Sequence, residues 1–99
     1  MIVKIPFNQR FIIPIASGNK TMTTRTKKYG KIGDVFYVVG RKIKCMIMGV
    51  ERLPLNIIML KFYKQEGFNS PNEFKDFWLT IHRTAPMAKK FYLHTFKRV

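Results

Sequence analysis

The chain has 99 residues, the length of one compact domain, and it carries a large excess of positive charge. Nineteen Lys and Arg stand against five Asp and Glu, so the formal net charge is +14. Hydrophobic residues make up 46% of the chain, which suffices for a folded core and excludes a disordered protein. The charge indicates a polyanionic partner, nucleic acid or an anionic membrane surface; a generally basic surface that serves solubility is the alternative.

The sequence offers little material for a metal centre, a disulfide or a membrane span. Cys45 is the single cysteine, and His82 and His94 are the two histidines. We therefore expect no disulfide framework, no metal and no cofactor. No apolar run approaches the ~18 residues of a transmembrane helix, and residues 1–10 lack an apolar signal-peptide core. The expectation is a cytoplasmic monomer that makes no membrane contact.

The first half of the chain is rich in strand patterns. Residues 2–7 alternate and predict a first strand that ends near Pro6. Residues 11–17 predict a short helix, with Gly18 at its C-terminal cap. Residues 21–25, rich in β-branched side chains, predict a second strand.

A turn over residues 29–34 then leads to two strands, at 34–39 and 42–50. In the second of these, Ile43, Cys45 and Ile47 fall on one face, which predicts that this face is buried. Asp34, directly after Gly33, is expected to stabilise the turn.

The second half predicts helices and a last strand. Asn56 starts a helix that Gly67 stops, and Ser70-Pro71-Asn72-Glu73 forms a capping box for the next helix. An apolar stripe follows in that helix at helical spacing: Phe74, Phe77, Trp78 and Ile81. Trp78 is interpreted as a core residue rather than a base-stacking platform. Residues 90–98 predict a closing strand with His94 at a surface or interface. The fold class is α+β, a small mixed sheet or barrel with two or three helices.

Residues 18–25 carry the most informative motif, GNKTMTTR, followed by Gly33-Asp34. Further on stand Glu66-Gly67-Phe68 and the Phe74 to Trp78 spacing, then Ile81-His82. These features resemble the ASCH domain, and the resemblance runs from about residue 11 to residue 96. It implies a single ASCH domain over residues 1–99. It also implies a PUA-like fold, a small β-barrel with flanking helices that binds RNA.

The motif has a physical interpretation of its own. Thr21, Thr23 and Arg25 alternate along a strand and so share one face, over which Lys20 leans from the helix–strand junction. A cation beside hydroxyl groups suits a phosphate or a nucleobase carbonyl. The alternative is a solvated hairpin with ordinary strand threonines.

The first functional hypothesis is an RNA-binding module, or one that binds another polynucleotide. Basic side chains that a barrel brings to one rim would contact the phosphates, and tyrosines 29, 37 and 92 would stack on bases. The expected contact residues share positive charge or a hydroxyl group: Lys20, Thr21, Thr23, Arg25, Lys27, Lys28, Lys42, Lys44, Arg83 and Lys90.

The second hypothesis is an amidohydrolase that acts on N4-acetylcytidine, as a small nucleoside substrate or within RNA. The resemblance to ASCH amidohydrolases implies the catalytic set Lys20, Thr23 and Glu73. A desolvated Lys would activate the Thr hydroxyl, and a carboxylic acid would protonate the leaving amine. Glu73 has a competing structural explanation, because it occupies the third helical position after the Ser70 cap in the capping box. Nuclease activity ranks last, since no paired carboxylates favour a metal nuclease.

Overall fold

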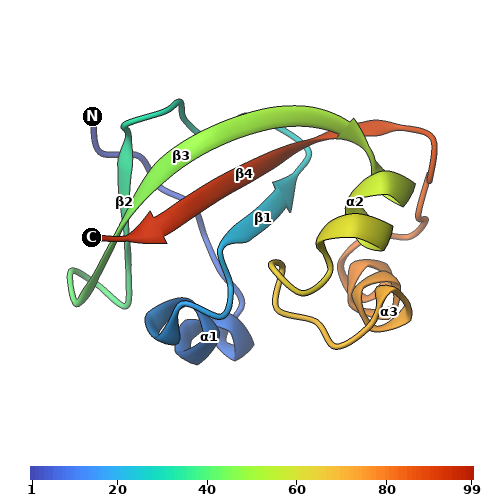
Figure 1. The fold of residues 1–99 in the computed structure, drawn as a ribbon, viewed down its shortest axis with the longest axis horizontal. Helices are drawn as coiled ribbons and strands as arrows, with labels where there is room; N and C mark the ends of the chain where they lie inside the picture. The colour runs from blue at the N-terminus through green and yellow to red at the C-terminus, as the bar shows by residue number, and fades with distance from the viewer.

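A curled, four-stranded antiparallel sheet forms the frame of the molecule, which the computed structural model describes over residues 1–99. The strand order is β1-β4-β3-β2, with β1 at Met22–Arg25, β2 at Val35–Val38, β3 at Ile43–Pro54 and β4 at Lys90–Arg98. Figure 1 shows β3 and β4 running side by side along the length of the molecule, with β1 against the inner edge of β4. The α+β class is therefore confirmed, and the sheet is a half-barrel.

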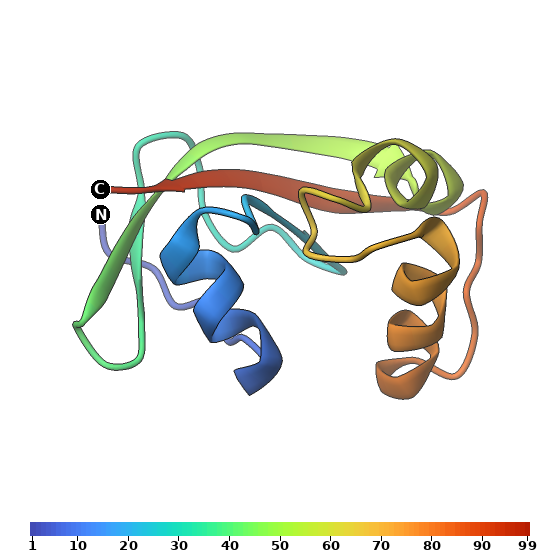
Figure 2. The ribbon, with the colours of Figure 1, turned by 60° about the horizontal axis from the view of Figure 1, so that its bottom comes forward.

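The helices lie along the sheet at its two ends. A short 3-10 turn, η1 at Gln9–Phe11, leads into α1 at Ile12–Ser17. At the other end lie α2 at Leu55–Phe62 and α3 at Pro71–Ile81. Figure 2 shows α1 and α3 on the same side of the sheet, separated along its length. None of these helices has the length and apolar character needed to cross a membrane.

Alternation along β3 builds the core as the sequence predicts. Ile43, Cys45 and Ile47 are buried, and they belong to one cluster of 17 buried apolar residues. Past Ile47 the pairing of β3 with β4 shifts by one residue before Gly49, and this irregularity bends the long strand. The bend lets the sheet curl around the core.

Residues 2–7 do not form the predicted strand. The only pairing there is an isolated parallel bridge between Ile2 and Val35, supported by backbone hydrogen bonds of Val3 N–H to Val35 O and Val35 N–H to Met1 O. Pro6 has no N–H to continue a ladder, and the chain turns into η1 instead. The prediction of a strand over residues 2–7 was therefore wrong.

Two other boundaries differ from the sequence prediction. The strand β3 continues to Pro54, beyond the predicted end at residue 50, because β4 pairs with it as far as Lys90. The helix α2 ends at Phe62, before the predicted stop at Gly67, and residues 63–67 form turns. The predicted helix after Ser70 and the predicted last strand are both confirmed.

The start of α3 follows the predicted cap, with one difference. Ser70 Oγ accepts a hydrogen bond from Glu73 N–H at 3.1 Å, as an N-cap does. The Glu73 carboxylate does not return to Ser70 but contacts Arg10 and Asn69. Phe74 and Trp78 are buried as expected, whereas Ile81 is 60% exposed because it is the last residue of the helix.

Candidate functional site

A cavity of about 250 Å³ opens between the start of the chain, β1 and α3. Its floor carries most of the polar part of the GNKTMTTR motif, and its walls carry aromatic rings. The lining residues come from four segments: Pro6, Phe7, Asn8 and Phe11; Lys20, Thr23, Thr24, Arg25, Thr26 and Tyr29; Glu66 and Phe68; and Phe74, Phe77, Trp78, Ile81 and His82. Distant parts of the sequence thus meet at one place.

Lys20 and Glu66 form a buried ion pair in this cavity wall. Lys20 Nζ lies 3.3 Å from Glu66 Oε1 and also donates to the Glu66 backbone carbonyl. The other carboxylate oxygen, Oε2, accepts a hydrogen bond from the Thr24 hydroxyl. Both oxygens of Glu66 are therefore occupied by donors from the motif. The Lys20 ammonium also lies 4.3 Å from the centroid of the Phe11 ring.

The local chain path explains how Glu66 reaches the motif. After α2 the chain turns, and the Gln65 carbonyl accepts hydrogen bonds from the N–H groups of Thr21 and Met22 at 2.8 and 3.1 Å. Gly67 has φ +98°, a left-handed conformation that other residues adopt only with strain. This turn fastens the segment to the start of β1 and directs the Glu66 side chain inward.

Burial changes the protonation chemistry of Lys20. Desolvation is the largest effect and lowers the pKa of Lys20 below its ordinary value of 10.5, while the charge of Glu66 acts in the opposite direction. The positive charges of Arg25 and Arg10 lower it further. A lysine of this kind gives up its proton more readily than a surface lysine, which is a property of lysines that act as bases.

Thr23 and Arg25 share one face of β1, as the alternation predicts. Arg25 Nε donates to Thr23 Oγ1 at 3.0 Å, and another Arg25 nitrogen donates to the Pro6 carbonyl. The guanidinium lies between the rings of Phe7 and Tyr29, at 4.9 and 5.5 Å from their centroids. Since the Thr23 oxygen accepts this bond, its hydroxyl proton remains available to a ligand.

His94 lies beside Thr23 in the sheet, and the prediction of a surface or interface position was wrong. The two residues are paired across β1 and β4, and His94 is fully buried. Its Nε2 accepts a hydrogen bond from Tyr29 N–H at 3.1 Å, whereas Nδ1 has no hydrogen-bond partner. Desolvation is the largest effect on this ring and lowers the pKa of His94. A neutral histidine thus lies next to the polar floor and bonds the backbone at Tyr29.

Aromatic rings close the other side of the cavity. The rings of Trp78 and His82 stack with centroids 4.1 Å apart, and Trp78 Nε1 donates to the Thr84 carbonyl at 3.0 Å. Phe68 stacks on Phe74 at 4.8 Å. Trp78 is both a core residue, as predicted, and part of the cavity wall. The cavity thus has polar side chains from the GNKTMTTR motif on one side and aromatic side chains on the other.

The structure gathers some of the predicted site residues and leaves others outside. Lys20, Thr23 and Arg25 line the cavity together, but Thr21 does not. Glu73 also lies outside the lining: its carboxylate contacts Arg10 at 3.4 Å and Asn69 at 3.3 Å on the surface of α3. The carboxylate inside the cavity is that of Glu66, which the sequence singled out only as part of Glu66-Gly67-Phe68. The position of Glu66 directly before Gly67 was the signal in the sequence that could have identified it as a site residue.

The predicted basic residues do not form one rim. Lys27 lies beside the cavity, with Nζ 4.9 Å from the centroid of the Tyr29 ring, and Arg83 directly follows His82. Lys28 lines a separate shallow depression with Lys31.

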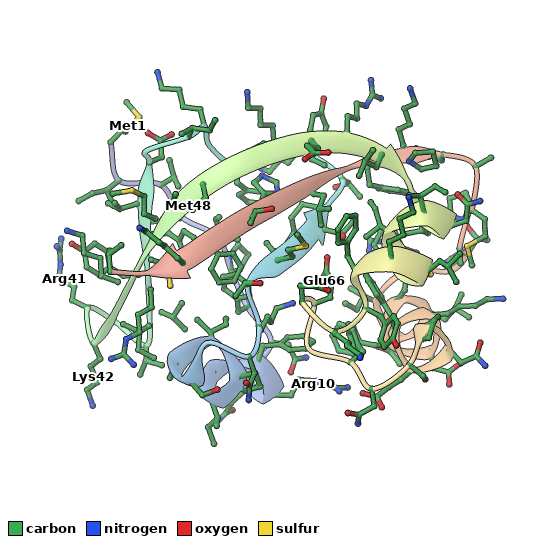
Figure 3. The ribbon with its side chains drawn as sticks, in the orientation of Figure 1. Met1, Arg10, Arg41, Lys42, Met48 and Glu66 are labelled. Atoms are coloured by element: carbon green, nitrogen blue, oxygen red, sulfur yellow. The ribbon has the colours of Figure 1, made fainter.

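The remaining predicted contacts lie at the ends of the sheet. Figure 3 shows Lys42 at the tip of the β2–β3 hairpin, well away from Glu66. Lys44 follows in the same hairpin, and Lys90 starts β4 opposite Pro54. No group of three or more His, Cys, Asp or Glu is placed to hold a metal ion.

Comparisons with known proteins bear on the fold. No family model matches this chain, and no curated protein does. The hypothetical protein PH0355 is similar, with a TM-score of 0.73 and 15% identity over 94% of each chain. PF0455 from Pyrococcus furiosus has a TM-score of 0.70 and 16% identity over 100% of this chain and 98% of its own.

A third similar structure carries a family assignment. EF3133 from Enterococcus faecalis V583, of the family DUF984, has a TM-score of 0.62 and 20% identity over 91% of this chain and 70% of its own. At these identities the likenesses show a shared fold. The chain thus shares its fold with proteins whose names state no activity.

Proposed function

We propose that this protein binds single-stranded RNA and holds one unstacked base in the cavity between β1 and α3. The observation that carries the proposal is the cavity itself, which Lys20, Thr23 and Arg25 line together with Phe77 and Trp78. RNA-binding proteins recognise single strands by stacking splayed bases on aromatic rings and hydrogen-bonding their edges. A volume of about 250 Å³ suits one base rather than a larger ligand.

The net charge of +14 supports a polyanionic ligand over a neutral one. We place the sugar–phosphate chain at the mouth of the cavity, along Arg25, Lys27 and Arg83. Lys42 and Lys44 lie in the distant hairpin, so we leave them out of this contact set. The protein is proposed to act as a cytoplasmic monomer without a cofactor.

The resemblance of the GNKTMTTR motif to ASCH domains supports the same proposal. We assign the chain to that family and its half-barrel to the PUA-like fold. The motif lines the floor of the cavity, where it would contact the bound RNA. The curled sheet is compatible with such a barrel.

Fluorescence anisotropy with a labelled single-stranded RNA tests the proposal. Thr23→Val removes one hydroxyl at nearly constant volume, and we expect a two- to tenfold weaker affinity, about 0.5–1.5 kcal/mol. Thr80→Val is the matched control, because Thr80 lies exposed on α3 and bonds only the Phe77 carbonyl. No binding by the wild type at ~50 mM salt would refute RNA binding.

A second candidate, amide hydrolysis on N4-acetylcytidine, is favoured by the buried Lys20 and its lowered pKa. In this proposal Lys20 first passes its proton to Glu66 within the ion pair, and the neutral amine then accepts the hydroxyl proton as Thr23 Oγ adds to the acetyl carbonyl. The proton passes to the leaving amine, and water then releases acetate from the threonine ester. Glu66, which contacts the Lys20 amine, replaces Glu73 as the carboxylate of the set that the resemblance implies.

Acetate release from N4-acetylcytidine tests this candidate. We expect Glu66→Gln to reduce turnover at least ~100-fold and Glu73→Gln to leave it nearly unchanged. Thr80→Val, at an exposed position on α3 away from Lys20 and Glu66, is the control for Thr23→Val. Wild-type protein that releases no acetate would exclude hydrolysis and leave the binding function standing.

A further inference from the structure

Arg10 lies over the aromatic wall of the cavity, although no sequence pattern singled it out. Its guanidinium carbon is 5.1, 5.2 and 5.1 Å from the ring centroids of Phe11, Phe68 and Phe77. All three rings line the cavity, whereas Arg10 packs against them from outside the lining. The Arg10 side chain is nevertheless 45% exposed. A positive charge is thus fixed against the cavity wall within reach of solvent.

Most hydrogen-bonding capacity of this guanidinium is unused. An arginine has five N–H donors, and the Arg10 side chain makes one hydrogen bond, to Glu73 Oε1 at a long 3.4 Å. Both partners are partly exposed, so the pair is weak and easily exchanged. The second Glu73 oxygen, Oε2, accepts a hydrogen bond from the Asn69 side chain at 3.3 Å. Arg10 is therefore held by three rings and a replaceable carboxylate.

The neighbouring groups favour an anion at this place. Glu66, the carboxylate within the cavity, has both oxygens bonded, by Lys20 and by Thr24. Lys20 and Arg25 add positive charge on the cavity floor. A guanidinium binds phosphate through two parallel N–H donors, a better match than its single long bond to Glu73.

We propose that Arg10 binds a phosphate group of the nucleotide whose base occupies the cavity, and that Glu73 holds Arg10 in position until that phosphate displaces it. The inference rests on the base-binding function proposed above. It assigns Glu73 the role of an internal competitor for the ligand phosphate. The Arg10–Glu73 contact thus links η1 and α3 beside the cavity.

Binding of ribonucleosides and of their 5′- and 3′-monophosphates tests the inference, with Trp78 fluorescence as the readout because Trp78 is the single tryptophan and lines the cavity. We expect one monophosphate to bind about tenfold tighter than its nucleoside. Arg10→Gln should bring the two ligands to equal affinity. Arg41→Gln is the control, since it removes the same charge at the distant hairpin (Figure 3).

The competitor role makes the opposite prediction for Glu73. Glu73→Gln should tighten monophosphate binding about two- to fivefold, the effect of losing a weak exposed pair. Asp76→Asn is the matched control, because it removes an equal charge from the exposed side of α3 without touching Arg10. An equal gain in both variants would indicate a general charge effect and overturn the competitor role.

The outcomes separate this inference from the function on which it rests. Nucleosides that bind as tightly as their monophosphates would overturn the phosphate role of Arg10 and leave the base pocket intact. Failure of every nucleoside and monophosphate to bind would overturn both. Should Arg10→Gln fail to fold, Arg10→Lys keeps the positive charge but not the paired donors, and it should lose most of the tenfold difference.

Discussion

Lys20 Nζ and Glu66 Oε1 lie 3.3 Å apart although the residues are separated by 46 positions, and their side chains are only 2% and 4% exposed. A buried pair of this kind contributes little net stability, because desolvation of both charges offsets their attraction. Loss of one partner is costly, since the other charge is then buried alone. The pair thus fixes the cavity floor rather than strengthening the fold.

We predict strong coupling between these two residues. Lys20→Met should lower the free energy of unfolding by about 3–5 kcal/mol, because it leaves the Glu66 carboxylate without its cation. Adding Glu66→Gln should restore part of that loss, since a neutral amide needs no counter-ion. Urea unfolding measures both changes. As the control, Lys61→Met at an exposed position of α2 should change the free energy of unfolding by less than about 0.5 kcal/mol. Additive losses in the double variant would contradict the coupling.

Trp78→Ala should destabilise the protein by about 3–5 kcal/mol, because the ring is buried against Phe91 and His82. Thermal unfolding checks this, with Leu79→Ala as the control at an exposed position of the same helix. A variant that keeps its melting temperature but loses RNA binding would show that Trp78 serves the ligand alone.

RNA affinity should fall steeply with salt. If about four to eight phosphates are neutralised, the slope of log affinity against log salt should be about −3 to −7. Lys27→Gln combined with Arg83→Gln should reduce the magnitude of that slope by about two, one for each contact. Lys42→Gln combined with Lys44→Gln should leave the slope nearly unchanged. A larger effect of the hairpin pair would place the RNA on the hairpin.

Stability should decrease as the pH falls below about 6.5, the ordinary pKa of histidine. Burial is the largest effect and lowers the pKa of His94 in the folded state. The positive charge of Arg25 lowers this pKa further, whereas the negative charge of Glu66 raises it. At a pH just below 6.5, His94 therefore binds a proton in the unfolded chain but not in the folded chain, so acid favours unfolding.

Urea unfolding between about pH 7.5 and pH 5 checks this effect. His94→Gln keeps an acceptor for Tyr29 N–H and should flatten the pH dependence. Asp34, whose pKa is lowered by the Lys31 N–H, acts in a more acidic range, below its ordinary 3.8. An unchanged pH dependence in His94→Gln would show that another group titrates.

Local signals in the sequence predicted most of the elements. Ser70 and Pro71 start α3, Gly18 with φ +85° ends α1, and alternation along β3 identifies its buried face. Each of these depends on neighbours within a few residues, which a sequence pattern contains. Ile2–Phe7 failed because a strand also needs a partner, and the edge of β2 accepts only one bridge there.

The site could be predicted only in part. The motif placed Lys20, Thr23 and Arg25 together because Thr23 and Arg25 lie in one short strand and Lys20 lies two residues before it. Glu66 meets Lys20 through a contact across 46 positions, which no local pattern encodes. His94 is buried because both β1 and the segment at Tyr29 cover it, and burial of that kind depends on tertiary packing.

The most direct test of the base pocket is the amide spectrum of ¹⁵N-labelled protein during titration with a short single-stranded RNA. The Trp78 indole N–H gives a unique signal at the cavity wall. We predict that this signal and the amides of Thr23, Thr24 and Arg25 shift together with saturation, and that those of Arg41 and Lys42 do not. Shifts confined to the β2–β3 hairpin, with the Trp78 signal unmoved, would contradict the assignment of the cavity as the RNA site.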